Sequence, residues 1–311
     1  MESQVEFPTE NKDGRETHID QNENLADNID ALSLGRTRRK EDSERLVANM
    51  TTSASCKQYN MCHAKRGQAV IFTHRDYSPG GPTPRPCATH DTEICKIAFE
   101  ALGFEVEVYL NRDMYNFNAT LSRIASRDHT NCDALVVVFM SHGCEEKNKE
   151  YLWLYDRKIE NAELWKAFTA DNCPTLAGKP KLFFIQACRG DKVDKGVILK
   201  QKKGLPVMTD AKVEEDYTIP LHADMLIMWA SYPGMFAFKS GRKGMNGSVF
   251  LHYLNKVLMR DHENDDLSTM LLTVTREVAT HFESVSDKEI LHKNKQIPYT
   301  VSTLMRKIVF N

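Results

Sequence analysis

Two reactive side chains directly follow two apolar segments of the sequence. Residues 134–140 form a continuous apolar run that leads through Ser141 to His142, and residues 181–187 lead to Cys188. A thiol is a weak nucleophile at neutral pH, and a nearby imidazole raises its reactivity as a general base or as an ion-pair partner. The types and positions of His142 and Cys188 therefore predict covalent catalysis by a cysteine.

The two side chains can react together only if the segments before them are neighbouring strands. Continuous apolar runs are typical of parallel strands that are covered on both faces, and ligands of open α/β sheets bind beyond the carboxyl ends of the strands. His142 and Cys188 would then share one crevice. Gly143 has no side chain, so an acyl carbonyl can approach its backbone, and the N–H groups of Gly143 and Cys188 are candidates for an oxyanion hole.

Each of these residues has a simpler explanation when it is considered alone. A histidine at the end of a strand is usually structural, and a lone cysteine is usually a small buried hydrophobic residue. A metal site formed by His142, Cys144 and Cys188 is a further alternative, but it lacks a fourth ligand and the usual ligand spacing. We expect neither a metal nor a cofactor.

Strand patterns and helix patterns alternate along most of the chain. The predicted strands cover residues 68–72, 104–110, 134–140, 181–187, 225–230, 298–304 and 308–310. The predicted helices lie around residues 94–102, 117–125, 164–168, 250–257 and 270–282. This alternation predicts an α/β fold with a mostly parallel central sheet and helices on both faces.

The composition limits the partners and the compartment of the protein. The chain has 311 residues, 41% of them hydrophobic, with a formal net charge of -2, so nucleic acid is not an expected partner. No apolar run is long enough for a membrane span, and the first residues lack the apolar segment of a signal peptide. We expect a cytoplasmic protein whose eight cysteines are free thiols rather than a disulfide framework.

Two stretches do not fit the α/β pattern. Residues 1–60 begin with an acidic segment that has few apolar residues and cannot offset the entropy cost of ordering, which predicts a disordered tail. Residues 190–218 are rich in charged residues and glycine and show no periodicity. A structureless stretch of this length within a compact domain predicts a functional or mobile segment.

The residues around Cys188 form a specific motif. Residues 186–190 read Gln-Ala-Cys-Arg-Gly, which is the caspase signature, and caspases carry the partner histidine roughly 50 residues upstream. Similar matches occur at residues 178–183, 247–248, 278–280 and 295–298. The sequence therefore resembles the caspases, and among them the short-tailed executioner type, over about residues 68–310.

The resemblance implies a cysteine endopeptidase that cleaves proteins after aspartate, with a role in apoptosis. It implies a caspase-like fold in which a disordered prodomain, residues 1–60, precedes a large subunit, residues 61–210, and a small subunit, residues 211–311. In this reading Cys188 is the nucleophile and His142 is the acid and base. The main-chain carbonyl at the position of Thr83 orients the imidazole, so no third side chain is required.

The resemblance also implies a basic pocket for the aspartate side chain of the substrate. Arg85 and Gln186 match two of the family's pocket residues, and Lys239 stands in the place of a second arginine. Phe236 and Phe238 fill positions where family members place aromatic residues that wall the adjacent pocket. On composition alone, Arg85 and Lys239 would be ordinary surface bases.

Several positions depart from the family pattern. Lysine is a single point charge, whereas the planar fork of arginine grips a carboxylate with two parallel hydrogen bonds, so Lys239 changes the pocket. Phe238 and Val249 replace tryptophans, and Pro86 and Cys87 replace a small pair of residues after Arg85.

Two functions therefore stay open. One is an active Asp-specific peptidase, which the presence of His142 and Cys188 favours. The other is a weakly active or inactive regulator that pairs with an active caspase, which Lys239 keeps open. A peptidase specific for Arg or Lys is disfavoured, because its pocket should be acidic.

The resemblance further implies a zymogen that is activated by cleavage. The best site for cutting the linker is after Asp210, because a small residue follows and the surroundings are polar; Asp194 and Asp216 are alternatives. The tail is expected to be removed after Asp30. The implied partners are protein substrates with exposed Asp sites, a second copy of the chain or another caspase in a dimer, and inhibitor proteins.

Overall fold

The central sheet of the protein has the strand order β11-β8-β7-β3-β1-β2. The computed structural model describes residues 48, 52–196, 220–242 and 245–310, all within one compact unit of residues 45–311. The strands of this sheet are β1 (Lys65–Thr73), β2 (Glu105–Leu110), β3 (Cys132–Met140), β7 (Lys181–Gln186), β8 (Met225–Trp229) and β11 (Tyr299–Ser302). Only β11 runs antiparallel to its neighbour among these described strands. The prediction of a mostly parallel central sheet is confirmed.

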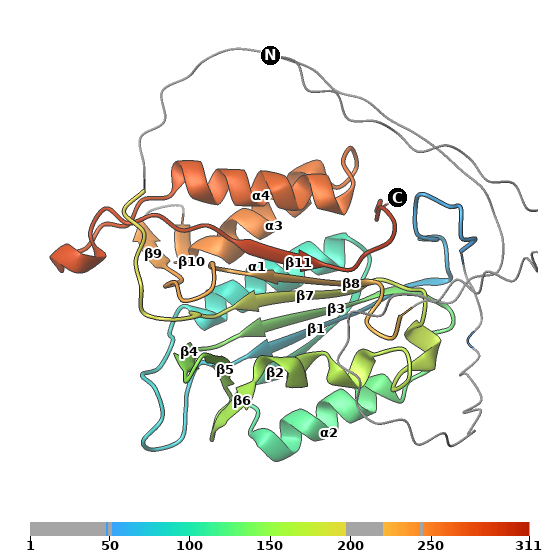
Figure 1. Cartoon of the computed structure of the whole chain (residues 1–311), viewed down its shortest axis with the longest axis horizontal. Helices are drawn as coiled ribbons and strands as arrows, with labels where there is room; N and C mark the ends of the chain where they lie inside the picture. Colours follow the sequence, from blue (N-terminus) through green and yellow to red (C-terminus); the bar gives the residue numbers. More distant parts are fainter. Residues whose placement is uncertain (1–47, 49–51, 197–219, 243–244, 311) are drawn as a thin grey trace, which may run out of the picture. The chain divides into compact units, whose positions relative to one another are not determined.

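Helices cover both faces of the sheet, as predicted (Figure 1). One face carries α1 (Ala88–Ala101), α3 (Val249–Asp261) and α4 (Leu267–His281), and the other carries α2 (Met114–Ala125). The carboxylate of Asp113 begins α2 by accepting a hydrogen bond from the N–H of Asn116. No helix among the described residues is long and apolar enough to cross a membrane.

The sheet separates two hydrophobic cores, because successive side chains of a strand point to opposite faces. In β7, Phe184 packs against Phe99 of α1, with ring centroids 5.9 Å apart. Its neighbour Phe183 packs on the other face against Phe168, at 6.2 Å. The fully buried pattern of β3 and β7 explains why their sequences are continuously apolar.

Two predicted elements differ in the structure. The helix expected around residues 164–168 is a pair of short 3₁₀ turns, η1 (Asn161–Leu164) and η2 (Lys166–Phe168). The apolar residues there span a single turn, too short for a stable α-helix, and i→i−3 hydrogen bonds close the turns instead. Residues 308–310 are not a strand, although Ile308 and Phe310 are buried in the core.

Two small antiparallel sheets were not predicted. One contains β4 (Gly143–Glu146), β5 (Lys149–Trp153) and β6 (Lys158–Glu160), and the other pairs β9 (Lys239–Arg242) with β10 (Met245–Ser248). Between β4 and β5, Lys147 and Asn148 both have positive φ, as a tight two-residue hairpin turn requires. β4 begins directly after His142, and β9 begins with Lys239.

The fold begins before residue 60, so the predicted end of the tail is too late. Tyr59 is only 5% exposed, and its hydroxyl donates to Asp224 at 2.7 Å. Its main-chain N–H donates to the oxygen of Lys307 at 2.9 Å. The aromatic side chain of Tyr59 and the apolar side chain of Met61 were missed as core residues because polar residues surround them in the sequence.

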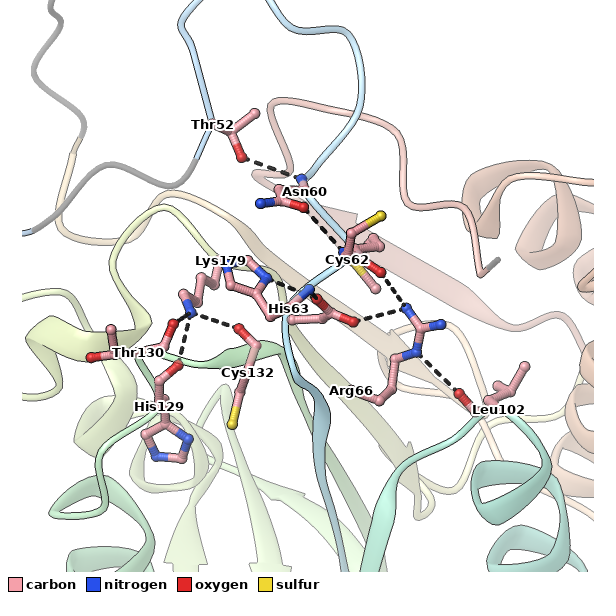
Figure 2. A network of polar contacts seen from close by, with 12 residues as sticks. Thr52, Asn60, Cys62, His63, Arg66, Leu102, His129, Thr130, Cys132 and Lys179 are labelled. Carbon is pink, nitrogen blue, oxygen red and sulfur yellow. Dashed lines mark hydrogen bonds and ion pairs between the residues drawn. The ribbon is translucent and has the colours of Figure 1, made fainter.

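Polar contacts at the amino-terminal ends of β1 and β3 fix the entry of the chain into the sheet (Figure 2). Arg66 donates from Nε to the oxygen of Leu102 at 3.2 Å and from Nη1 to Asp133 at 2.9 Å. The buried ammonium of Lys179 donates to three main-chain oxygens, those of His129, Thr130 and Cys132, at 2.8, 2.6 and 2.6 Å. These contacts satisfy buried polar groups at one end of the sheet and leave the carboxyl ends of the strands to the candidate site.

Candidate active site

His142 and Cys188 follow the ends of two adjacent parallel strands. β3 pairs with β7 up to Met140 and Gln186, and the N–H of Ser141 donates to the oxygen of Gln186 at 3.0 Å. His142 and Cys188 each lie two residues beyond this last pair. The predicted adjacency of the two strands is therefore correct, and it brings both side chains to the same edge of the sheet.

Gly143 lies against the backbone of Cys188. A Cβ atom at this position would be 2.2 Å from the main-chain oxygen of Cys188 and 3.1 Å from the Cβ of Ala187. Any side chain would force these two segments apart, so glycine is required for the close approach. Besides the expected approach of a substrate carbonyl, Gly143 therefore permits a close contact within the chain itself.

The imidazole of His142 is oriented by a main-chain oxygen. Its Nε2 atom lies 2.8 Å from the carbonyl oxygen of Thr83. A carbonyl only accepts hydrogen bonds, so this contact assigns the proton to Nε2 and leaves the lone pair on Nδ1. Burial lowers the pKa of His142 below its ordinary value; the bond to Thr83 opposes this shift, and the charges of Arg85 and Lys239 add to it.

The thiol of Cys188 is partly buried beside the main chain of Ala237. Its Sγ lies 3.5 Å from the N–H nitrogen of Ala237 and 3.7 Å from its oxygen. Burial raises the pKa of Cys188, which the contact with Ala237 and the charges of Arg85 and Lys239 only partly offset. At neutral pH the pair therefore consists of a neutral thiol and a neutral imidazole, which suits general-base activation of the thiol.

Three of the predicted substrate-binding groups gather at this edge of the sheet. Arg85 is only 5% exposed and donates from Nη1 to the oxygen of His74 at 3.3 Å. Lys239 is exposed, and its charge acts on both His142 and Cys188, as that of Arg85 does. Gln186 is buried, and its Oε1 has no hydrogen-bond partner within the described part of the chain. Two positive charges make this region suitable for an anionic group, and the free amide oxygen can accept a hydrogen bond from a separate donor.

A groove of about 480 Å³ lies beside Lys239. The rings of Phe236 and Phe238 are 5.2 Å apart, and Phe238 is 5.4 Å from Phe282. The lining residues include Phe236, Phe238, Lys239, Phe282, Val285 and Leu291. The predicted aromatic residues thus line a groove together with Lys239.

Gln296 positions the chain that carries Phe238, a role that the sequence did not reveal. Its Oε1 accepts from the N–H of Phe238 at 2.7 Å, and its Nε2 donates to the oxygen of Ala230 at 2.8 Å. The side chain is 3% exposed. Glutamine is ordinarily a surface residue, so its burial here has no signal in composition or periodicity.

Arg189, directly after Cys188, is engaged by an acidic and two aromatic side chains. It forms a two-bond ion pair with Glu150, at 2.8 Å for both Nε and Nη2. Its guanidinium also lies over the rings of Trp229 and Tyr299, at 4.6 and 5.1 Å from their centroids. These contacts hold the residues that follow Cys188, so the arginine of the signature motif has a structural role in this chain.

The predicted processing sites are only partly described. Asp30, Asp210 and Asp216 lie outside the described residues. Asp194 is exposed, but its main-chain oxygen accepts from the N–H of Lys295 at 2.8 Å, and its carboxylate accepts from the N–H of Gly196 at 2.7 Å. Within the described residues, no group of three or more His, Cys, Asp and Glu side chains is arranged to hold a metal ion.

Comparison with known proteins identifies relatives over most of the chain. A family profile described as the caspase domain matches residues 66–309. Caspase-1 of Spodoptera frugiperda is 36% identical over 265 residues, which cover 85% of this chain and 85% of that protein. Caspase-1 of Drosophila melanogaster is 37% identical over 269 residues, which cover 86% and 80%. The crystal structure of caspase-1 from Spodoptera frugiperda matches with a TM-score of 0.76 and 35% identity, covering 85% of this chain and 99% of that chain.

Proposed function

The chain belongs to the caspase family of cysteine peptidases, and on this premise we propose that it is an active endopeptidase that cleaves proteins after aspartate. The observation that carries the proposal is the orientation of His142 by Thr83 at the same sheet edge as Cys188. The imidazole presents its unprotonated Nδ1, as a general base requires. Arg85 and Lys239 add the positive charge that a carboxylate side chain of the substrate needs.

The proposed reaction is acyl transfer through a thioester. Nδ1 of His142 takes the proton of the Cys188 thiol, and Sγ attacks the carbonyl carbon on the carboxyl side of the substrate aspartate. The N–H groups of Gly143 and Cys188 are the proposed donors to the oxyanion of the tetrahedral intermediate. His142 then gives its proton to the leaving amine as the C–N bond breaks. A water molecule, deprotonated by His142, hydrolyses the thioester and releases the new carboxyl end.

The specificity for aspartate rests on Arg85, Gln186 and Lys239 in the proposal. Arg85 is buried and held by the oxygen of His74, so its charge has a fixed position. Toward a carboxylate, Gln186 would act through the N–H groups of its amide, and its unsatisfied Oε1 is left to accept from another donor or from an ordered water. Phe236 and Phe238 are the proposed wall of the adjacent pocket.

A single experiment tests this function. The purified full chain is incubated with four fluorogenic peptides that differ only in their last residue, which is Asp, Glu, Arg or Lys. We expect the Asp peptide to have the highest kcat/KM, the Glu peptide a lower value, and the basic peptides none. Preferential hydrolysis of the Arg or Lys peptide would contradict the proposed pocket.

A second candidate function is that of a weakly active or inactive regulator that pairs with an active caspase. The observation that favours it is the lysine at residue 239, a single point charge at a position where the resemblance to the family implies a forked arginine. The regulator function becomes the better explanation if none of the four peptides is cleaved. Co-expression with an active caspase should then change the rate of that partner.

We extend the proposal to an executioner caspase that acts in apoptosis in the cytoplasm. The supporting feature is the composition of residues 190–218, which are rich in charged residues and glycine and include Asp194 and Asp210. The division into a prodomain that ends before Tyr59, a large subunit up to residue 210 and a small subunit of residues 211–311 is part of this proposal. A homodimer or a heterodimer with another caspase would pair through β11, which has β8 on one side and no other described strand on the other.

A further inference from the structure

Tyr77 contacts the candidate base His142 in two ways. Its hydroxyl oxygen accepts a hydrogen bond from the main-chain N–H of His142, at 3.2 Å. The two rings also pack together, with centroids 5.5 Å apart and planes inclined by 50°. Tyr77 therefore supports both the backbone and the imidazole of the same residue.

The hydroxyl of Tyr77 is the centre of a small hydrogen-bond network. Ser141 is 3% exposed and donates its only hydroxyl proton to the oxygen of Trp153 at 2.6 Å. At its 2.9 Å contact with Tyr77, Ser141 must therefore accept. The single hydroxyl proton of Tyr77 is shared between two acceptors, the hydroxyl oxygen of Ser141 and the main-chain oxygen of His74 at 3.2 Å. The hydroxyl oxygen of Tyr77 in turn accepts from the main-chain N–H of His142.

This network supplies a hydrogen bond that the sheet cannot supply. β3 ends at Met140, and its ladder with β7 ends at Gln186, so the N–H of His142 has no strand partner. The oxygen of His142 accepts from the N–H of Trp153 at 3.0 Å, and Nε2 contacts Thr83. Nδ1 is the polar atom of His142 that has no such bond within the described residues.

Tyr77 and Thr83 lie on the same loop after β1. A Cβ atom at Gly81 would be 2.9 Å from the Cβ of Tyr77, so the loop folds tightly over the tyrosine. The same loop continues to Arg85. One segment thus holds the backbone of His142 through Tyr77 and its ring through Thr83.

We infer that Tyr77 is a positioning residue for His142, which holds the imidazole so that Nδ1 can reach the thiol of Cys188. This inference rests on the proposed peptidase function. The hydroxyl fixes the backbone of His142, and the aromatic ring limits rotation of the imidazole. Tyr77 itself touches neither the thiol nor the substrate in this assignment.

The test uses Tyr77→Phe in the full chain, which keeps the ring and removes the hydroxyl. The matched control is Tyr155→Phe: Tyr155 is half-buried, its main-chain oxygen contacts the N–H of Ser78 in the same loop, and its hydroxyl has no hydrogen bond within the described residues. Titration with an irreversible Asp-containing inhibitor gives the number of active sites. Mass spectrometry of the Cys188 peptide follows alkylation by iodoacetamide as a function of pH.

We expect Tyr77→Phe to lower kcat per active site about 5- to 50-fold and to change KM less than about twofold, because the main-chain N–H of His142 loses its acceptor without loss of substrate contacts. Alkylation of Cys188 near neutral pH should also become slower, because the base is less well held. Tyr155→Phe should leave all of these values unchanged.

Three results would overturn the assignment of Tyr77. The first is a kcat within twofold of the wild-type value. The second is a loss of titratable sites or of melting temperature with normal kinetic constants in the remaining sites, which is a structural role. The third is an unchanged pH profile of Cys188 alkylation. If wild-type protein cleaves none of the peptides, the proposed function fails separately, and the alkylation profile alone decides the role of Tyr77.

Discussion

The Nε2 atom of His142 lies 2.8 Å from the main-chain oxygen of Thr83, a residue of the loop that also carries Arg85. The contact sets the tautomer of the imidazole without an acidic side chain. Because the partner is a backbone oxygen, a change in the identity of residue 83 should matter less than a change in the path of the loop. The base and the basic pocket are therefore aligned by one segment.

Replacement of either member of the catalytic pair should abolish hydrolysis. We expect Cys188→Ala and His142→Ala to lower kcat on an Asp peptide by at least about a thousandfold, because the nucleophile or its base is removed. The melting temperature should stay close to that of the wild type, since both residues lie beyond the strand ends. Kinetic assays and thermal unfolding of the purified variants measure the two effects.

The exposed Cys56 provides the matched control for the cysteine variant. Cys56→Ala should retain full activity. If Cys188→Ala or His142→Ala kept most of the wild-type rate, the proposed mechanism would be wrong.

The pH dependence of kcat/KM should report the depressed pKa of His142. Burial and two nearby positive charges lower this pKa below 6.5. The base works only when it is unprotonated, so activity is present above this lowered pKa and is lost as the pH falls through it. The midpoint of the acid limb is expected below pH 6.5, measured on an Asp peptide across about pH 4 to 8.

The same profile tests the contribution of Lys239. Lys239→Gln removes one of the charges that lower the pKa of His142, so the acid limb should move to higher pH in addition to any loss of rate. Lys166→Gln, at a side chain that is 70% exposed and is not among the charges acting on His142, should leave the limb in place. An unshifted limb in Lys239→Gln would argue against electrostatic coupling between the two residues.

The sequence predicted the parts of the fold whose side chains have a uniform environment. β3 and β7 are buried on both faces, so their apolar runs are unambiguous, and the residues that follow them could be identified as a reactive pair. The hairpins β4–β6 and β9–β10 are short and only partly buried, so they have little periodicity. Their existence depends on turn geometry, such as the positive φ values of Lys147 and Asn148.

The candidate site likewise contains residues that the sequence predicted and residues that it did not. His142 and Cys188 were predicted from residue type and position, and the pocket residues came from resemblance to a family. Tyr77 and Gln296 were missed, because each acts through a hydrogen bond to the main chain of a residue distant in sequence. Such bonds depend on the path of two loops relative to each other, and a single sequence contains no periodic signal for them.

The contact between Tyr59 and Asp224 should contribute to the stability of the folded domain. Asp224 is fully buried, and burial together with the Asp224 charge raises the pKa of Tyr59, so its hydroxyl stays protonated and donates. Tyr59→Phe leaves the carboxylate without this donor and should lower the free energy of unfolding by about 1–3 kcal/mol. Urea denaturation monitored by tryptophan fluorescence measures the change.

Tyr115→Phe is the control for this prediction, because Tyr115 is 82% exposed. Its free energy of unfolding should equal that of the wild type. A value for Tyr59→Phe within a few tenths of the wild type, roughly the error of such measurements, would show that the buried carboxylate finds another partner.

Processing of the active protein should occur within residues 190–218, with the first cut after Asp210. Asp194 is a poorer substrate, because its main-chain oxygen is bonded to Lys295 and the segment would have to detach before it could enter a protease groove. Mass spectrometry of the fragments should therefore change in Asp210→Ala and not in Asp194→Ala. Intact single-chain protein with full activity would argue against activation by cleavage, and removal of the tail after Asp30 can be followed in the same spectra.

Lys239 offers the sharpest test of how the pocket recognises its substrate. It begins β9 and lines the groove beside Phe238, and the resemblance to the family implies a forked arginine at this position. The loss of one arm of a charge-assisted pair costs about 1.5–3 kcal/mol in a site that excludes water. This energy corresponds to roughly a 10- to 100-fold lower kcat/KM than an arginine pocket would give.

Lys239→Arg should therefore raise kcat/KM on the Asp peptide. It should also sharpen the preference for Asp over Glu, because the longer reach and free torsions of lysine allow the longer side chain of Glu to compete.

The competing explanation is that the pocket is shaped around lysine. Phe238 is 7% exposed and packs against Phe236 and Phe282, so a bulkier neighbour would be overpacked and activity would fall. Lys166→Arg, at a lysine that is not among the charges acting on His142, controls for the general effect of the substitution. A flat or falling kcat/KM for Lys239→Arg, with the control unchanged, would show that this lysine is an adapted ligand for the carboxylate and not a weakened one.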